Sequence, residues 1–116
     1  MITITNEKQV FVYTDENGKN HFNRWFQSLD KTTKTRVLKR IKRVAAGNYG
    51  DCKRLDSDIY ELRLFFGSGY RIYFAERNNE CVVLLCAGDK SSQPQDIERA
   101  KIYWKEYKDN AKTFDA

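Results

Sequence analysis

The chain has 116 residues, with 21 lysines and arginines against 16 aspartates and glutamates and one histidine, so its formal net charge is +5. This length predicts one domain over residues 1–116, with a core of about 8–110, that needs no metal or disulfide to fold. The order of strands and helices given below makes it an α+β domain. With 41% hydrophobic residues the chain is too apolar to be disordered. Its longest apolar run, 82–87, is too short to cross a membrane.

The N-terminus lacks the basic flank and the apolar core of an export signal. The three cysteines form no CxxC pair, and an odd number of scattered thiols is typical of a reducing compartment. A single histidine does not provide the usual zinc-ligand patterns. We therefore expect a cytoplasmic protein with no metal site, no cofactor and no membrane partner.

The first half of the chain predicts a strand followed by two helices. Residues 10–14 are β-branched and aromatic, which favours a short strand. Apolar residues at i, i+3, i+4 and i+7 spacing predict a helix over 19–29. Asp30 is a suitable N-cap for a second helix over 31–46, which Gly47 closes.

Outside its apolar stripe, the helix over 31–46 is almost entirely basic. A solvated helix normally mixes charges of both signs, whereas this helix carries no acid after Asp30. Two interpretations stay open, a solvated face and a surface for a polyanion or an acidic protein partner. The polyanion interpretation assigns RNA or ribosome binding to Lys34, Lys39, Arg40, Lys42, Arg43 and Lys53.

The second half predicts an antiparallel β-meander and a final helix over about 93–109. The strands cover residues 58–66, 70–75 and 81–87. A three-residue loop at 67–69 and a two-residue turn at 78–79 connect them. The third strand is apolar on both faces, so we expect it to be central, next to the N-terminal strand. The predicted cross-strand pairs are Leu64–Ile72, Leu62–Phe74, Arg63–Tyr73 and Arg71–Cys86.

In this register one sheet face is the core, and the other carries Arg63, Arg71 and Tyr73, with Lys90 near the strand end. Like charges this close repel each other unless an anion lies between them. One interpretation is a surface ion-pair lattice in which acidic neighbours, Glu61 and Asp89, neutralise the arginines. The other is a phosphate site, because guanidinium groups match phosphate oxygens with two parallel hydrogen bonds.

RNA carries its own nucleophile, the 2′-hydroxyl. A basic cluster can therefore promote cleavage without a metal, by orienting the phosphate, stabilising its charge and moving protons. Aromatic side chains such as Phe65 or Tyr70 offer faces on which bases stack. His21 belongs to the first predicted helix, away from this cluster, and is interpreted as an ordinary surface residue.

A family resemblance rests on four sequence strings that occur in order. They are Glu61-Leu-Arg63, Gly67-x-Gly-Tyr-Arg-Ile-Tyr73, Val83-Leu-Leu-Cys-Ala-Gly-Asp-Lys90 and Gln93-x-x-Asp-Ile-Glu-Arg-Ala-Lys101. Together they resemble the HigB-like "addiction module killer protein" branch of the RelE/ParE toxin superfamily, and the resemblance covers roughly residues 8–108. The resemblance implies that superfamily's compact α+β fold.

The resemblance further implies the toxin of a type II toxin–antitoxin pair, a metal-independent endoribonuclease that cuts messenger RNA on the ribosome. The implied partners are a cognate antitoxin, commonly a small helix-turn-helix protein, and the ribosome with its message. Operator DNA would be contacted only through the antitoxin complex.

Carried onto this chain, the family's active surface comprises catalytic residues and two residues that flank the last turn. The catalytic residues are Arg63, Arg71, Tyr73 and Lys90, and the flanking residues are Asp89 and Gln93. Some HigB proteins carry a histidine here, whereas this chain has none after His21, so the identity of the general base stays open. Lys90 or Tyr73 could serve, or the ribosome could supply part of the chemistry. Two alternatives remain: a ParE-like inhibitor of DNA gyrase that cuts no RNA, and a non-catalytic binding or co-repressor module.

Overall fold

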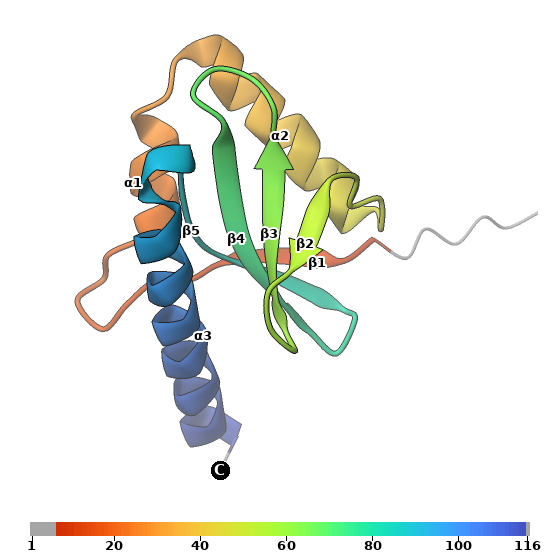
Figure 1. Cartoon of the computed structure of the whole chain (residues 1–116). Helices are drawn as coiled ribbons and strands as arrows, with labels where there is room; N and C mark the ends of the chain where they lie inside the picture. The colour runs from red at the N-terminus through yellow and green to blue at the C-terminus, as the bar shows by residue number, and fades with distance from the viewer. Residues whose placement is uncertain (1–6, 116) are drawn as a thin grey trace, which may run out of the picture.

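The computed structural model describes residues 7–115 as a five-stranded sheet packed between helices (Figure 1). In chain order the elements are β1 (Gln9–Val12), α1 (His21–Gln27), α2 (Lys31–Ala45), β2 (Cys52–Arg54), β3 (Ile59–Leu64), β4 (Tyr70–Arg77), β5 (Cys81–Gly88), the 3₁₀ turn η1 (Lys90–Ser92) and α3 (Gln93–Asp115). This confirms the α+β class and the predicted order of strand, two helices, meander and helix. β2 is a short edge strand that the sequence analysis did not predict.

Local hydrogen bonds set where the first two helices begin. Asn20 caps α1 by accepting from the Asn23 backbone N–H at 2.9 Å, so this helix is shorter than predicted. Asp30 caps α2 as predicted, because its carboxylate accepts from the Thr33 N–H at 2.7 Å. Of the helices in the described part of the chain, none is long and apolar enough to span a membrane.

The strand order is β1-β5-β4-β3-β2. β5 lies between β1, which is parallel to it, and β4, which is antiparallel. The residues from Val82 to Leu85 are buried, as expected for a strand that is covered on both faces. The predicted central position of this strand beside the N-terminal strand is therefore confirmed.

The predicted pairing of β3 with β4 is wrong by two residues. Leu64 lies opposite Tyr70, and Arg63 lies opposite Arg71. The connection is thus five residues long, 65–69, and Gly67 and Gly69 adopt positive φ values of 58° and 77° there. A shift of two residues keeps every side chain on its face, so the hydrophobic pattern could not detect the error.

The predicted pairing of β4 with β5 is also wrong. Arg77 pairs with Cys81, so three residues separate the strands, and Arg71 lies opposite Gly88 rather than Cys86. The register shifts again between Tyr73 and Phe74, which pair with Cys86 and Leu84. Because β5 is apolar throughout, its side-chain pattern carries no register information.

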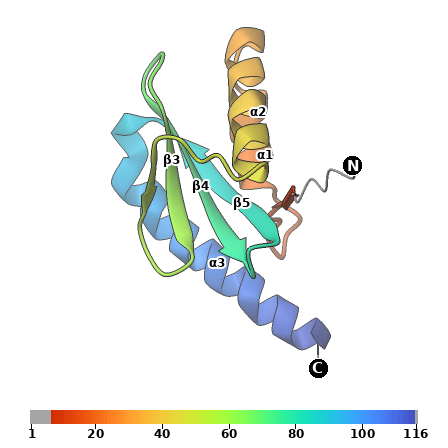
Figure 2. The same cartoon turned by 90° about the vertical axis from the view of Figure 1, so that its right-hand side faces the viewer.

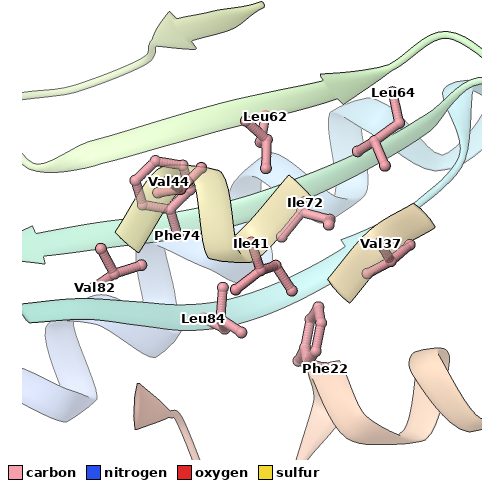
Figure 3. Close-up of a cluster of buried hydrophobic side chains, with 10 residues drawn as sticks. All are labelled: Phe22, Val37, Ile41, Val44, Leu62, Leu64, Ile72, Phe74, Val82 and Leu84. Atoms are coloured by element: carbon pink, nitrogen blue, oxygen red, sulfur yellow. The ribbon is translucent and has the colours of Figure 1, made fainter. Parts of the chain in front are cut away.

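Helices cover both faces of the sheet, whereas the sequence analysis assigned the core to one face. Figure 2 shows α2 on one side of the sheet and α3 on the other. The first core, drawn in Figure 3, joins α1 and α2 to the sheet. It contains Phe22, Val37, Ile41, Val44, Leu62, Leu64, Ile72, Phe74, Val82 and Leu84.

The second core lies under α3. It contains Tyr13, Ile59, Tyr73, Ala75, Val83, Leu85, Cys86, Ala100 and Trp104. Leu85 and Cys86 both join this core although they are consecutive, as expected where the bulge inserts an extra residue into β5. The helix therefore buries the part of the second face that holds Tyr73.

Candidate functional site

A buried carboxylate, that of Glu61 in β3, lies at the centre of the site. Its side chain is 0% exposed and accepts from Arg63 Nε at 3.0 Å. Tyr73 Oη donates to it at 3.2 Å, and Gln93 Nε2 at 2.9 Å. Burial alone would raise the pKa of Glu61, but the hydrogen bonds from Gln93, Arg63 and Tyr73 outweigh it and hold the pKa below its usual value. Glu61 therefore carries a negative charge beneath the surface at neutral pH.

Arg63 and Arg71 extend outward above this carboxylate. The Arg71 Nε lies 3.8 Å from Glu61 Oε1, and its side chain is 14% exposed against 30% for Arg63. The hydrogen bond to Glu61 raises the pKa of Arg63. Within the described residues, Arg71 Nε is buried and has no hydrogen-bond partner. One carboxylate thus faces two guanidinium groups, so the cluster of Glu61, Arg63 and Arg71 has a net positive charge.

These arginines line an open pocket of about 370 Å³, here called the hairpin pocket. Its lining residues are Arg63, Leu64, Phe65, Phe66, Gly67, Ser68, Gly69, Tyr70, Arg71 and Lys90. This set contains three cations and no carboxylate or imidazole. The pocket therefore suits an anion, because its charge is uncompensated on the solvent side.

Lys90 reaches this pocket because the chain turns sharply after β5. A Cβ on Gly69 would lie 3.7 Å from Lys90 Cβ, so the hairpin loop and η1 are adjacent. A Cβ on Gly88 would lie 2.1 Å from Asp96 Oδ2 and 2.6 Å from Ser92 Oγ. Only glycine therefore fits at position 88, where the start of α3 packs on the end of β5.

The residues predicted to flank this turn have structural contacts of their own. Asp89 caps η1 by accepting from the Ser91 N–H at 2.9 Å, and hydrogen bonds from Ser91 lower its pKa. Gln93 fixes the Glu61 carboxylate, as described above. Neither residue lines the hairpin pocket.

Tyr73 does not occupy the exposed position that the sequence analysis predicted. It is 0% exposed beneath α3, and burial together with the Glu61 charge raises its pKa far above the usual value. Such a hydroxyl keeps its proton and cannot contact a substrate. Tyr70, which lines the hairpin pocket, is the tyrosine that the structure places at the surface of this site.

A second pocket of about 400 Å³, here called the α2 pocket, adjoins the first. Its lining residues are Arg36, Lys39, Arg40, Arg43, Gly50, Asp51, Arg63, Leu64, Phe65 and Phe66. Arg36 belongs to it although the predicted set of binding residues omits it, and Phe65, which the sequence analysis named only as a face for base stacking, belongs to it as well. Their signal was present in the sequence, as one more cation on the basic helix and an aromatic residue in the hairpin.

The other predicted binding residues divide into several environments. Arg40 donates to the backbone oxygens of Tyr49, at 2.5 Å, and Asp51, at 3.2 Å, and burial lowers its pKa, so it braces the loop after α2. Lys34 donates to Gln27 at 3.3 Å. Lys42 and Lys53 are exposed, and neither lines one of the two pockets.

His21 is not the ordinary surface residue that was expected. Its ring stacks on Tyr103 with centroids 4.5 Å apart, and its Nε2 lies 2.9 Å from Asp15 Oδ2. These contacts join the loop before α1 to α3, and His21 does not line the hairpin pocket. Within the described residues, no three His, Cys, Asp or Glu side chains gather in a group that could hold a metal ion.

The geometry described above belongs to a protein with a RelE-like fold. A solved structure of the E. coli toxin RelE, a double arginine-to-alanine mutant in the free state, is similar to this chain with a TM-score of 0.56. The two share 17% sequence identity over 86% of this chain and 93% of that one, and the likeness concerns the fold. The fold that the sequence resemblance implied is therefore confirmed.

The chain belongs to the family described as Phage derived protein Gp49-like (DUF891), which matches residues 24–108. A relative from Haemophilus influenzae, described as an uncharacterized protein, is 44% identical over 82 residues. The match covers 70% of this chain and 83% of the relative. The family match includes Arg63, Arg71 and Lys90, so the hairpin pocket lies within the shared region.

Proposed function

We propose that this protein is a HigB-like toxin of a type II toxin–antitoxin pair and that it cleaves messenger RNA on the ribosome. The observation that carries the proposal is the hairpin pocket, in which Arg63, Arg71 and Lys90 surround a space without any carboxylate. Membership of the Gp49-like family and the likeness to RelE, described as a toxin, support the same assignment.

In the proposed reaction the 2′-oxygen of the message attacks the adjacent phosphorus and the bond to the 5′-oxygen breaks. The products are a 2′,3′-cyclic phosphate and a 5′-hydroxyl. Arg71 and Arg63 stabilise the charge that develops on the phosphate oxygens. Lys90 delivers a proton to the departing 5′-oxygen. No metal takes part.

The residues that line the pocket include no carboxylate or imidazole to accept the proton of the 2′-hydroxyl, and our proposal assigns Lys90 to the leaving group. In our proposal the ribosome completes the site by orienting the message and supplying that acceptor. This accounts for the proposed dependence on translating ribosomes. Free RNA is then a poor substrate, because only part of the catalytic apparatus belongs to this chain.

The proposed partner that silences the toxin is a small antitoxin, with a helix-turn-helix domain as in the HigB-like branch. Its acidic side chains would neutralise the basic surface, on α2 or over the hairpin pocket. Operator DNA would be contacted through the antitoxin in that complex. The toxin would act in the cytoplasm, where the ribosomes are.

The absence of a carboxylate or imidazole from the residues that line the hairpin pocket favours one second candidate, an inhibitor that binds DNA gyrase without catalysis. Fold does not discriminate between these functions. Induced expression in growing cells does, when messages and DNA-damage signalling are followed together. The proposed function predicts growth arrest with rapid loss of messages and no damage response. A damage response with intact messages would select the gyrase inhibitor, and growth without arrest would select a non-catalytic binding module.

A further inference from the structure

Phe65 has an unusual position for a large apolar side chain. It lies in the loop between β3 and β4 and is 78% exposed, more than any other large apolar side chain in the described residues. The adjacent Phe66 packs against the first core and carries the Arg36 guanidinium over its ring, 4.8 Å from the centroid. The loop thus anchors one phenylalanine and presents the other to solvent.

The exposed ring lies between two cation-lined pockets. Phe65, with Arg63, Leu64 and Phe66, lines both the hairpin pocket and the α2 pocket. The two pockets therefore form one continuous surface around this ring. We call this surface the hairpin groove.

The α2 side of the groove carries more positive charge than its own acids offset. Its cations are Arg36, Lys39, Arg40 and Arg43, and its single carboxylate is Asp51. Arg40 is committed to backbone oxygens, but Lys39 and Arg43 are exposed. The groove thus offers charges beyond those needed at one scissile phosphate.

We propose that the α2 pocket is a separate subsite for single-stranded RNA, in which a base next to the cleaved segment stacks on Phe65. The flanking phosphates then lie against Lys39 and Arg43. This inference rests on the proposed function, and it extends the substrate site from one phosphate to a segment of several nucleotides. Grooves of this kind bind single strands by combining backbone charge with an aromatic stacking platform.

The alternative occupant is an acidic protein segment. Charge alone would suit it, but the exposed aromatic ring at the junction of the two cationic pockets favours an unpaired base. Stacking requires a flat π-face, and every base supplies one in any sequence. A carboxylate-bearing peptide has no such need for Phe65.

The test uses two single-stranded probes of equal length that the protein cannot cut. One is a 12-nucleotide 2′-O-methyl RNA, and the other is an abasic strand that keeps the phosphates and lacks the bases. Phe65→Ala should weaken the first probe about tenfold, or about 1.4 kcal/mol, and leave the abasic strand unchanged. Phe65→Trp keeps an aromatic ring at this position and should bind the 2′-O-methyl RNA as tightly as wild type. Ile102→Ala, which truncates another exposed apolar residue on α3, is the matched control and should bind as wild type.

The cations are tested in the same assay. Lys39→Ala and Arg43→Ala should weaken both probes alike and lower the slope of log K against log salt by about 0.7 each. Equal affinity of Phe65→Ala and wild type for the 2′-O-methyl RNA would overturn the inference. It would favour an acidic protein segment as the occupant of the groove. Binding that depends on Phe65 without any cleavage of messages would contradict the proposed function alone. Cleavage that requires Arg71 with no role for Phe65 would contradict this inference alone.

Discussion

Arg63 and Arg71 lie directly opposite each other on neighbouring antiparallel strands. Two like charges in this position destabilise a sheet unless something compensates them. Here Glu61, two residue pairs further along the ladder and on the same face, is fully buried and lies within 3.8 Å of both guanidinium groups. The Glu61 carboxylate offsets one of the two positive charges. The open pocket leaves the other available to bind an anion.

Arg71→Ala should abolish most of the activity while leaving the fold intact. Arg71 is the more buried of the two arginines that face the proposed phosphate, so its loss should reduce ribosome-dependent cleavage about 100-fold. Lys105→Ala removes an exposed cation from α3 and serves as the matched control, with wild-type cleavage expected. Circular dichroism verifies that both variants fold. Full activity of a folded Arg71→Ala protein would remove this residue from the site.

Tyr73→Phe should lower stability with little effect on cleavage. The substitution removes one buried hydrogen bond to Glu61, which should cost about 1 kcal/mol in the free energy of unfolding. Because the hydroxyl is buried, the cleavage rate should stay within about threefold of wild type, whereas a lost proton donor costs about 100-fold or more. Denaturant titration and a cleavage time course measure the two effects separately.

Glu61→Gln should destabilise the protein at neutral pH by about 3 kcal/mol, because it leaves two arginines above a buried neutral group. The folded-state pKa of Glu61 lies below its unfolded value, so its stabilising contribution is present above about pH 4.3 and is lost as the pH falls through the folded pKa. The variant should therefore lose less stability than wild type on acidification from pH 6 to pH 3. Parallel acid-unfolding curves for the two proteins would show that Glu61 is not the titrating group.

Gly88→Ala should disturb the position of Lys90. The new methyl group would overlap the Asp96 carboxylate, and overpacking of this kind costs about 2 kcal/mol. Gly18→Ala is the control, because a Cβ there meets nothing within 4 Å and only the positive φ of 78° opposes it. Unfolding measurements give the stability of each variant, and a cleavage assay under conditions where both are folded gives their activity. Gly88→Ala should lose cleavage even when folded, whereas Gly18→Ala should cleave as wild type.

The sequence predicted the fold well because its periodicities are strong. Apolar residues at helical spacing located α2, and alternation correctly placed Leu62, Leu64 and Ile72 on the core face. It could not determine the β3–β4 register, because a shift of two residues leaves every face unchanged. For that reason the sequence analysis did not predict that Arg63 and Arg71 lie directly opposite each other.

The site was predicted in part. Alternation correctly placed Arg63, Arg71 and Tyr73 on one face, and the chain after β5 brings Lys90 to it. Burial of Tyr73 could not be predicted, since it depends on where α3 crosses the sheet. The role of Glu61 was weighed only as surface neutralisation, because nothing local in the sequence shows that its carboxylate lies beneath the arginines.

The most direct test of the central claim is a cell-free translation reaction with the purified protein, in which message ends are mapped by primer extension with and without active ribosomes. Our account predicts cuts at codon boundaries that require translating ribosomes and disappear with Arg71→Ala but persist with Lys105→Ala. Messages that stay intact in the presence of translating ribosomes and folded wild-type protein would contradict it.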